Sequence, residues 1–326
     1  MMMPELLAPA GSYQAFLAAV ENGADAVYLG GTRFSARHHA ENFSDDDLRR
    51  SLEYAHVRER RVYVALNTLL DDLELAQALD YAFQLQDWGV DAVIVQDLGL
   101  LTALVEVFPA WRIHASTQMT IHNADGVRSL ADLGVKRVVL ARELGARDVE
   151  VIRSACPEVE LEVFVHGALC YSYSGQCLLS SVVGGRSGNR GRCAQPCRLP
   201  YRLMDRGKQM AAGYLLSPAD LSLLAQLPEL IDLGVTSLKI EGRMKRPEYV
   251  AVVTRVFRQA LDRWQDRDSG HAGEWSPTPQ EIYDLNSIFN RTLTVNQWSG
   301  SNKRVLFLDR PSNQGMVVGT VIKGRP

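Results

Sequence analysis

Four cysteines lie in one stretch of the chain, with the spacing C-x6-C-x15-C-x3-C: Cys170, Cys177, Cys193 and Cys197. Thiolates gathered in this way can close around a metal centre. One interpretation is a structural zinc site, although zinc sites usually have close pairs at both ends and only the second pair is close here. The wider first pair suits an iron–sulfur cluster at least as well. A third interpretation, small buried side chains, is disfavoured by the surrounding Gly, Ser and Arg residues.

The composition of the chain is ordinary for a globular protein, with 326 residues, 46% hydrophobic and 22% charged. It contains no apolar run of about 18 residues or more and no basic–apolar leader, so we expect a cytoplasmic protein with no membrane partner. Thiols stay reduced in that compartment, and five cysteines there favour metal binding or catalysis over disulfides. Because the net charge is −3, any contact with RNA must come from a local patch.

The elements that must position the cysteines follow a repeating pattern. In four segments a helix ends at glycine and a short apolar strand follows, as expected for a parallel sheet buried on both faces: residues 22–29, 89–95, 134–140 and 234–240. Four more strands are predicted at Glu5–Ala8, Arg61–Asn67, Trp111–Ser116 and Glu160–His166. Eight strands alternating with helices predict an α/β fold, a parallel (β/α)8 TIM-like barrel. An open doubly wound sheet is the alternative, weakened because no G-x-G-x-x-G follows the first strand.

We expect residues 1–265 to form the barrel, with a Cys-rich insertion at 170–214 that lacks helix–strand alternation. A long insertion at the carboxyl end of a strand is where barrel enzymes place their chemistry. A helix is predicted over Pro247–Trp264. Residues 266–326 are predicted to be a linker, a helix and the start of a C-terminal β domain, with strands at Val305–Leu308 and Met316–Ile322. We expect this β unit to be truncated and the chain to be a fragment of a longer protein.

Polar side chains stand at the predicted carboxyl ends of the strands, where barrel geometry would direct them to one mouth: Asn67, Gln96, Gln118, Arg142, Glu143, His166, Glu241 and Arg243. His166 is the candidate proton carrier, because the unperturbed pKa of histidine is about 6.5. Its alternative is a core histidine bonded to backbone. Glu241, between Lys239 and Arg243, is either a catalytic carboxylate or a salt-bridged strand end.

The insertion is also basic. Seven Arg and Lys residues against one Asp give residues 186–208 a charge of +6, and Tyr171, Tyr173 and Tyr201 lie nearby in sequence. Arginine with interleaved tyrosine is typical of phosphate contact and base stacking. We therefore expect RNA contacts from Tyr173, Arg190, Arg192 and Arg198. The alternative is a solvated loop whose arginines pair with acids elsewhere or neutralise an anionic cluster.

Several runs of the sequence together resemble the peptidase U32 family: residues 4–11, 23–31, 162–181, 188–198 and 238–243. The resemblance covers about residues 4 to 265. It implies oxygen-independent hydroxylation supported by a [4Fe–4S] cluster, with the four cysteines of the insertion as ligands and zinc as the alternative metal. Family members of this kind hydroxylate a tRNA uridine, a cytidine of 23S ribosomal RNA or, as a paired type, ubiquinone precursors. The RNA members are linked to prephenate as a required metabolite.

The resemblance also bears on the branch and on the substrate anchor. Residues 289–291 and 310–315 are similar to the long, 23S ribosomal RNA branch, although Thr292-Leu293-Thr294 stands where a Gly-Phe-Thr-like run is expected. Arg142 or Arg243 could grip a dicarboxylate such as prephenate through two hydrogen bonds.

Three other functions remain as alternatives: a collagenase-like peptidase, a hydroxylase of a ubiquinone precursor, and a non-catalytic RNA-binding module. A peptidase is disfavoured because the chain has neither H-E-x-x-H nor G-x-S-x-G. His166 stands four residues before Cys170, but a cysteine committed to a cluster is not a free nucleophile.

Overall fold

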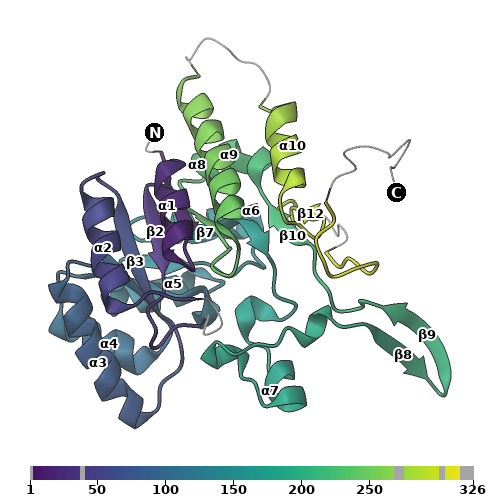
Figure 1. Ribbon diagram of the computed structural model, residues 1–326, viewed down its shortest axis with the longest axis horizontal. Helices are drawn as coiled ribbons and strands as arrows, with labels where there is room; N and C mark the ends of the chain where they lie inside the picture. Colours follow the sequence, from purple (N-terminus) through teal and green to yellow (C-terminus); the bar gives the residue numbers. More distant parts are fainter. Residues whose placement is uncertain (1–2, 37–40, 268–274, 301–304, 316–326) are drawn as a thin grey trace, which may run out of the picture.

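A closed ring of eight parallel strands forms the centre of the computed structural model, which describes residues 3–36, 41–267, 275–300 and 305–315 (Figure 1). The strands are β1 (Glu5–Pro9), β2 (Ala26–Leu29), β3 (Arg61–Leu66), β4 (Ala92–Val95), β5 (Arg112–Ala115), β6 (Arg137–Val139), β7 (Glu160–Ala168) and β11 (Ser237–Ile240). Strands β1 to β7 pair in chain order, and β11 pairs in parallel with both β7 and β1. This closure confirms the predicted TIM-like barrel and excludes the open doubly wound sheet.

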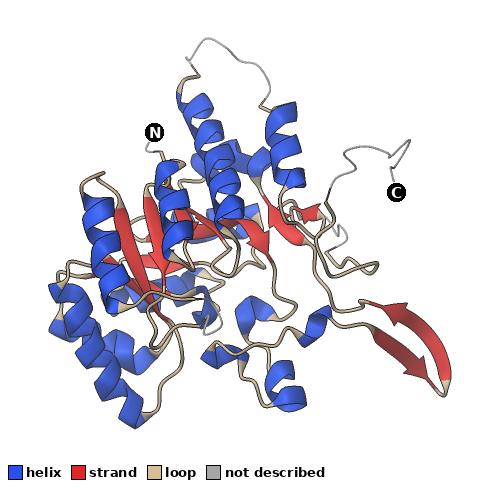
Figure 2. Cartoon of the chain, in the orientation of Figure 1, coloured by secondary structure: helices blue, strands red, loops and turns tan. Residues whose placement is uncertain are grey.

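Helices surround the ring of strands (Figure 2). They are α1 (Tyr13–Glu21), α2 (Asp45–His56), α3 (Asp72–Asp87), α4 (Leu98–Val107), α5 (Ala124–Asp132), α6 (Ala146–Ala155), α8 (Leu227–Asp232) and α9 (Pro247–Gln265). Helix α9 confirms the predicted helix, with Pro247 in its first turn and Val250, Val253, Phe257 and Leu261 buried. The four glycines that end helices before strands have positive φ: Gly23, Gly89, Gly134 and Gly234. Glycine adopts this backbone without a steric penalty, so the helix ends that it marked in the sequence are confirmed.

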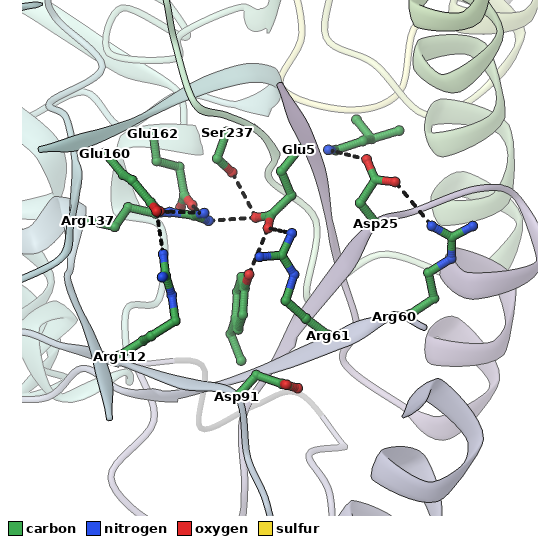
Figure 3. Close-up of polar contacts among 12 residues, drawn as sticks. Glu5, Asp25, Arg60, Arg61, Asp91, Arg112, Arg137, Glu160, Glu162 and Ser237 are labelled. Carbon is green, nitrogen blue, oxygen red and sulfur yellow. Dashed lines mark hydrogen bonds and ion pairs between the residues drawn. The ribbon is translucent and has the colours of Figure 1, made fainter. Parts of the chain in front are cut away.

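Toward the amino ends of the strands, the barrel interior holds charged side chains where barrels usually pack branched apolar ones (Figure 3). We call Glu5, Arg137, Glu162 and Lys239 the floor network. Arg137 Nη1 lies 2.5 Å from Glu5 Oε1 and 3.2 Å from Glu162 Oε2, and Lys239 Nζ lies 2.7 Å from Glu162 Oε1. The Tyr63 hydroxyl donates to Glu5 Oε2 at 2.7 Å. The network continues to Arg61, which lies 2.7 Å from Glu5 Oε2, and to Glu160, which lies 2.8 Å from Arg137 Nη2, so the buried charges are paired inside the ring.

The Cys-rich insertion after β7 contains the short helix α7 (Leu179–Gly184) and a hairpin of β8 (Tyr201–Asp205) and β9 (Lys208–Gly213). The sequence did not predict the hairpin, because both of its faces are largely exposed and its strands lack a buried stripe. In Figure 1 the hairpin extends away from the barrel. Its turn residues Arg206 and Gly207 both have positive φ, as a two-residue hairpin turn requires.

The chain after α9 packs back onto the barrel. Helix α10 (Pro279–Ser287) lies against α9, and Arg263 of α9 donates to Glu281 at 2.8 and 3.0 Å. Strand β10 (Asp220–Ser222) pairs antiparallel with β7 and parallel with β12 (Leu293–Thr294). Residues 305–308 make backbone hydrogen bonds to residues 214–219, with one bridge between Leu306 and Pro218. The second predicted strand, Met316–Ile322, lies outside the described residues, and the division of the chain at residue 265 stays a prediction.

No helix in the described parts of the chain combines the length and the apolar character needed to cross a membrane.

Candidate functional site

A cavity of about 350 Å³ lies between the carboxyl ends of the barrel strands and the Cys-rich insertion. We call this end of the barrel the mouth. The cavity wall includes five of the polar residues that the sequence placed at strand ends: Asn67, Gln118, Arg142, Glu241 and Arg243. Gln96 and Glu143, from the same predicted set, do not line it. The wall carries six basic side chains and one acidic side chain, so the cavity favours an anionic occupant.

All four cysteines of the insertion line this cavity. Cys193 is exposed and the other three are half-buried, while Cys156 is fully buried beside α6. Burial raises the pKa of the Cys197 thiol; Arg198 opposes the shift, and Cys170, Cys177 and Cys193 add to it. The Sγ atom of Cys177 accepts from the Leu179 N–H at 3.4 Å, and that of Cys193 accepts from the Gln195 N–H at 3.3 Å. The fold therefore brings together four thiols that are spread over 28 residues of sequence.

The four thiols at the cavity are the candidate ligands of a metal centre. Among the described residues, no three Cys, His, Asp or Glu side chains are grouped closely enough to hold one metal ion. Four thiolates on one zinc ion, each about 2.3 Å from it, must lie within roughly 4 Å of one another. The ligands of a multinuclear cluster bind different iron atoms and so stand further apart. The four cysteines are the residues that would hold either group, and the iron–sulfur cluster and the zinc ion both stay predictions.

Three contacts hold the insertion over the mouth. The Glu143 carboxylate accepts from the N–H and the hydroxyl of Ser174 at 2.8 and 2.7 Å. The guanidinium of Arg190 forms an ion pair with Glu74 at the start of α3. Gly191 packs so closely that a Cβ there would lie 2.7 Å from the Ser35 carbonyl oxygen. These contacts position the cysteines relative to the strands.

Arg142 and Glu241 face each other across the cavity. Arg142 Nη2 lies 3.6 Å from Glu241 Oε2, and Nη1 donates to the Ala168 carbonyl at 2.8 Å. The Arg142 guanidinium also stacks over the Phe164 ring, 4.3 Å from its centroid. Arg243 is only 4% exposed, and its Nη1 donates to Ser35 Oγ at 2.8 Å. Both arginines are thus held in place by protein contacts, and their role as a dicarboxylate clamp stays a prediction.

The structure places His166, the predicted proton carrier, outside the cavity. Its ring is 1% exposed and lies between Tyr249 and Phe257 of α9, with centroids 6.0 and 5.9 Å away. Burial, and to a lesser degree Lys245, lowers its pKa to about 3, and its Nδ1 has no hydrogen-bond partner. The β7–β11 register shifts just before the Ile240–His166 pair, and such an irregularity turns a side chain to the other face of the strand. The alternation along β7 therefore misplaced His166, and this position does not suit a proton carrier.

The predicted RNA contacts divide into two pairs. Arg190 is engaged with Glu74, and Arg198 donates to Ser217 Oγ at 2.7 Å and to the Leu169 carbonyl at 3.2 Å. Arg192 and Tyr173 have exposed side chains, and Tyr173 lies beside His122. Arg190 and Arg198 thus organise the insertion, whereas Arg192 and Tyr173 are open to a ligand.

The sequence did not identify two basic residues of the wall, Lys245 and Arg291. Lys245 follows the turn after β11, where the charged run Lys239 to Arg246 was a usable signal. Arg291 comes from the segment after α10, and its Nη1 lies 3.0 Å from Asp220 Oδ1 of β10. Its Nε donates to the Pro311 carbonyl at 2.8 Å. No local pattern in the sequence indicates that this distant segment returns to the mouth.

Comparisons with known proteins agree with this architecture. A family model described as peptidase family U32 matches residues 11–305. A 23S rRNA 5-hydroxycytidine synthase of Escherichia coli K12 is 39% identical over 98% of this chain and 49% of its own length. A tRNA hydroxylation protein of Bacillus subtilis 168 is 38% identical over 80% of this chain and 64% of its own length. The chain thus spans about half to two thirds of these two relatives. A solved U32 peptidase structure matches with a TM-score of 0.50 at 15% identity, covering 74% of this chain and 94% of that one, and supports the fold.

Proposed function

The chain belongs to peptidase family U32, and from this we propose that it is the catalytic barrel of an enzyme that hydroxylates a pyrimidine base of RNA. The product would be 5-hydroxycytidine in 23S ribosomal RNA or 5-hydroxyuridine in transfer RNA. Similarity to the ribosomal RNA enzyme extends over nearly the whole chain, which favours the first product. The observation that carries the proposal is the meeting of four thiols and an excess of basic side chains at one cavity.

Cys170, Cys177, Cys193 and Cys197 would hold a [4Fe–4S] cluster. When bound, such a cluster supplies one-electron redox chemistry beside the substrate. The N–H groups of Leu179 and Gln195 already donate to two of the sulfurs, and hydrogen bonds of this kind tune cluster potentials. The nearby Arg198 guanidinium would offset the negative charge of the thiolates.

The other wall residues would bind and orient the substrates. The Asn67 amide donates to Gln118 Oε1 at 2.9 Å, so both amides are held at the rim, where they can meet the edge of an unstacked base. The basic wall would attract the RNA phosphate or a dicarboxylate co-substrate such as prephenate. Arg192 and Tyr173 would contact the RNA outside the cavity through phosphate binding and base stacking. Such an enzyme would act in the cytoplasm.

Three other functions fit the geometry less well. A cysteine peptidase needs a histidine at its nucleophile. Cys170 lines the cavity, whereas His166 is buried against α9, so these two do not form a dyad. A purely structural RNA-binding module would not need an open cavity beside the thiols. The strongly basic wall also favours an anionic substrate over an apolar quinone precursor.

Mass spectrometry of RNA tests the reaction. A strain of the source organism that lacks the gene should lose 5-hydroxycytidine from its 23S ribosomal RNA, or 5-hydroxyuridine from its transfer RNA. Expression of the full-length protein should restore the nucleoside, whereas full-length protein carrying Cys177→Ser should not. Cys156→Ala is the matched control and should restore it, because Cys156 is buried at the end of α6 and is not among the residues that line the cavity. Unchanged levels of both nucleosides in the deletion strain would contradict the proposal.

Metal analysis tests the cofactor independently. Protein purified without oxygen should be brown and contain about four iron atoms per chain. Colourless protein with one zinc ion per chain would contradict the cluster.

A further inference from the structure

Lys245 differs from the other basic residues of the cavity wall. It stands in the loop between β11 and α9, where its N–H donates to the Gly242 carbonyl at 2.8 Å and closes a tight turn. Its side chain is half-buried and lines the cavity. The amine lies 3.1 Å from the centroid of the Phe289 ring and 5.5 Å from that of Tyr249. Lys245 thus reaches the cavity across an aromatic surface.

The remaining cations of the wall are engaged by protein groups. Lys239 pairs with Glu162, Arg291 with Asp220, and Arg142 with Glu241. Arg198 and Arg243 donate to the hydroxyls of Ser217 and Ser35. Within the described residues, no carboxylate lies within 4.0 Å of the Lys245 amine, and no hydrogen bond from this amine is formed. Among the basic side chains of the cavity wall, Lys245 is therefore the one most available to a bound molecule.

The surroundings of Lys245 lower the pKa of its amine. Burial is the main cause that lowers its pKa to about 8, with Arg291 and Arg198 acting in the same direction and Asp220 and Glu241 opposing them. Tyr249 of α9 stays neutral, because burial raises its pKa well above 10, and His166 stays neutral because its own pKa is low. The Phe289 ring favours the ammonium form. Both protonation states are thus populated near neutral pH, which suits a general acid or base.

We propose that the Lys245 amine is the catalytic proton carrier of the cavity, the role that the sequence suggested for His166. This inference rests on the proposed RNA hydroxylation, in which the hydrogen on carbon 5 of the pyrimidine must be replaced. The oxygen and the two oxidising equivalents come from the oxygen donor and the redox cofactor of the proposed reaction. In the step assigned to Lys245, carbon 5 already carries the new oxygen, the C–H bond breaks, and its electron pair re-forms the double bond between carbons 5 and 6. The proton forms a new N–H bond on the neutral amine.

Competitive labelling measures the protonation of Lys245 without any assay of activity. The full protein with its cofactor is treated with an amine-acylating reagent between pH 6 and 11, and the peptide that contains Lys245 is quantified by mass spectrometry. The extent of labelling should rise with a midpoint near pH 8, against about 10.4 for a lysine in a model peptide. A midpoint at the model-peptide value would overturn the proposal.

Two substitutions separate proton transfer from simple charge. Lys245→Arg keeps a cation that does not titrate in this range, and Lys245→Met removes the cation. Both should lower the turnover rate by about 100-fold or more, whereas Lys245→Arg should bind RNA within about threefold of wild type. Wild-type turnover should increase with pH up to about 8, and this increase should be absent from Lys245→Arg. Full activity in Lys245→Arg would show that only a fixed positive charge is needed and would overturn the inference.

A matched control is Lys136→Arg. Lys136 is exposed and precedes β6, at the opposite end of the strands from the cavity, so this variant should keep wild-type turnover. If wild-type protein hydroxylates neither RNA, the proposed function fails, and the labelling experiment still reports whether Lys245 titrates near pH 8.

Discussion

Both ends of the barrel interior carry charged side chains. The charges are paired at the floor, whereas basic side chains predominate at the mouth. At the floor, the two cations Arg137 and Lys239 meet the two carboxylates Glu5 and Glu162 at 2.5 to 3.2 Å. At the mouth, five basic side chains besides Lys239 share the cavity wall with one carboxylate and four thiols. The floor cations are buried and paired with carboxylates, whereas the mouth is open and its wall carries more basic than acidic side chains. The same ring of strands thus separates a structural charge cluster from a site that can attract an anion.

The pKa directions follow this contrast. Burial alone would lower the pKa of Arg137, but Glu5 and Glu162 outweigh it and raise the pKa. Burial would raise the pKa of Glu162, but Lys239 and Arg137 outweigh it and lower the pKa. At the mouth, no partner outweighs burial at Lys245, and its pKa falls. Paired floor charges therefore stay ionised, and the mouth keeps a group that can exchange a proton.

Removal of a floor cation should have the largest effect on stability. Arg137→Met removes the buried cation that Glu5 and Glu162 share and leaves them only Arg61 and Lys239, so we expect the free energy of unfolding to fall by about 3 kcal/mol. Urea denaturation followed by circular dichroism measures this change. Arg128→Met is the control, because Arg128 pairs with Asp125 on the surface of α5 and should change stability by less than about 1 kcal/mol. Equal losses of stability in the two variants would show that the buried ion pairs of the floor contribute no more than a surface pair.

The buried His166 predicts a loss of stability in acid. The folded protein leaves this histidine unprotonated above about pH 3, whereas the unfolded chain binds a proton below about pH 6.5. Because the unfolded state then holds more protons, stability falls as the pH drops below 6.5. From pH 7 to 5, wild type should lose roughly 2 kcal/mol more than His166→Phe. Parallel pH profiles would instead indicate that His166 is protonated in the fold.

Removal of the ion pair that ties the insertion to α3 should have a small effect on the free energy of unfolding. Arg190→Ala breaks a partly exposed ion pair with Glu74, and we expect at most about 1 kcal/mol of destabilisation. Limited proteolysis should nevertheless cut within residues 170–214 faster than in wild type, because this pair ties the insertion to α3. A similar substitution at an exposed hairpin residue, Arg202→Ala, should leave the cleavage rate unchanged. Unchanged cleavage in Arg190→Ala would show that the other contacts suffice.

Substitution of a cysteine at the mouth should change stability least but should remove most of the bound iron. Cys193 is exposed, so Cys193→Ser should alter the unfolding free energy of the metal-free protein by about 0.5 kcal/mol or less. The same variant should lose most of its bound iron, measured by colorimetric iron analysis, while Cys156→Ala keeps it. Full iron content in Cys193→Ser would remove Cys193 from the ligand set.

Local patterns were sufficient for the barrel and for most of the polar residues predicted at its mouth. Strand positions followed from short apolar runs, and five of the eight predicted strand-end residues line the cavity because parallel strands end at one mouth. His166 does not line the cavity, because a single register shift reverses the face of a strand and alternation cannot reveal such a shift. The β8–β9 hairpin was missed for a related reason, since strands exposed on both faces carry no apolar alternation.

By itself, the sequence determined the eight-stranded barrel, the place of the insertion and the identity of its four cysteines, because each depends on residues near one another in the chain. Only the tertiary structure decided which charges meet. Glu5 and Arg137 are 132 residues apart and form one ion pair, and Asp220 and Arg291 are 71 apart and form another. It also decided that Lys245, and not His166, faces the cavity. Burial and charge partners arise only when distant segments pack together, and these set the chemistry of a side chain.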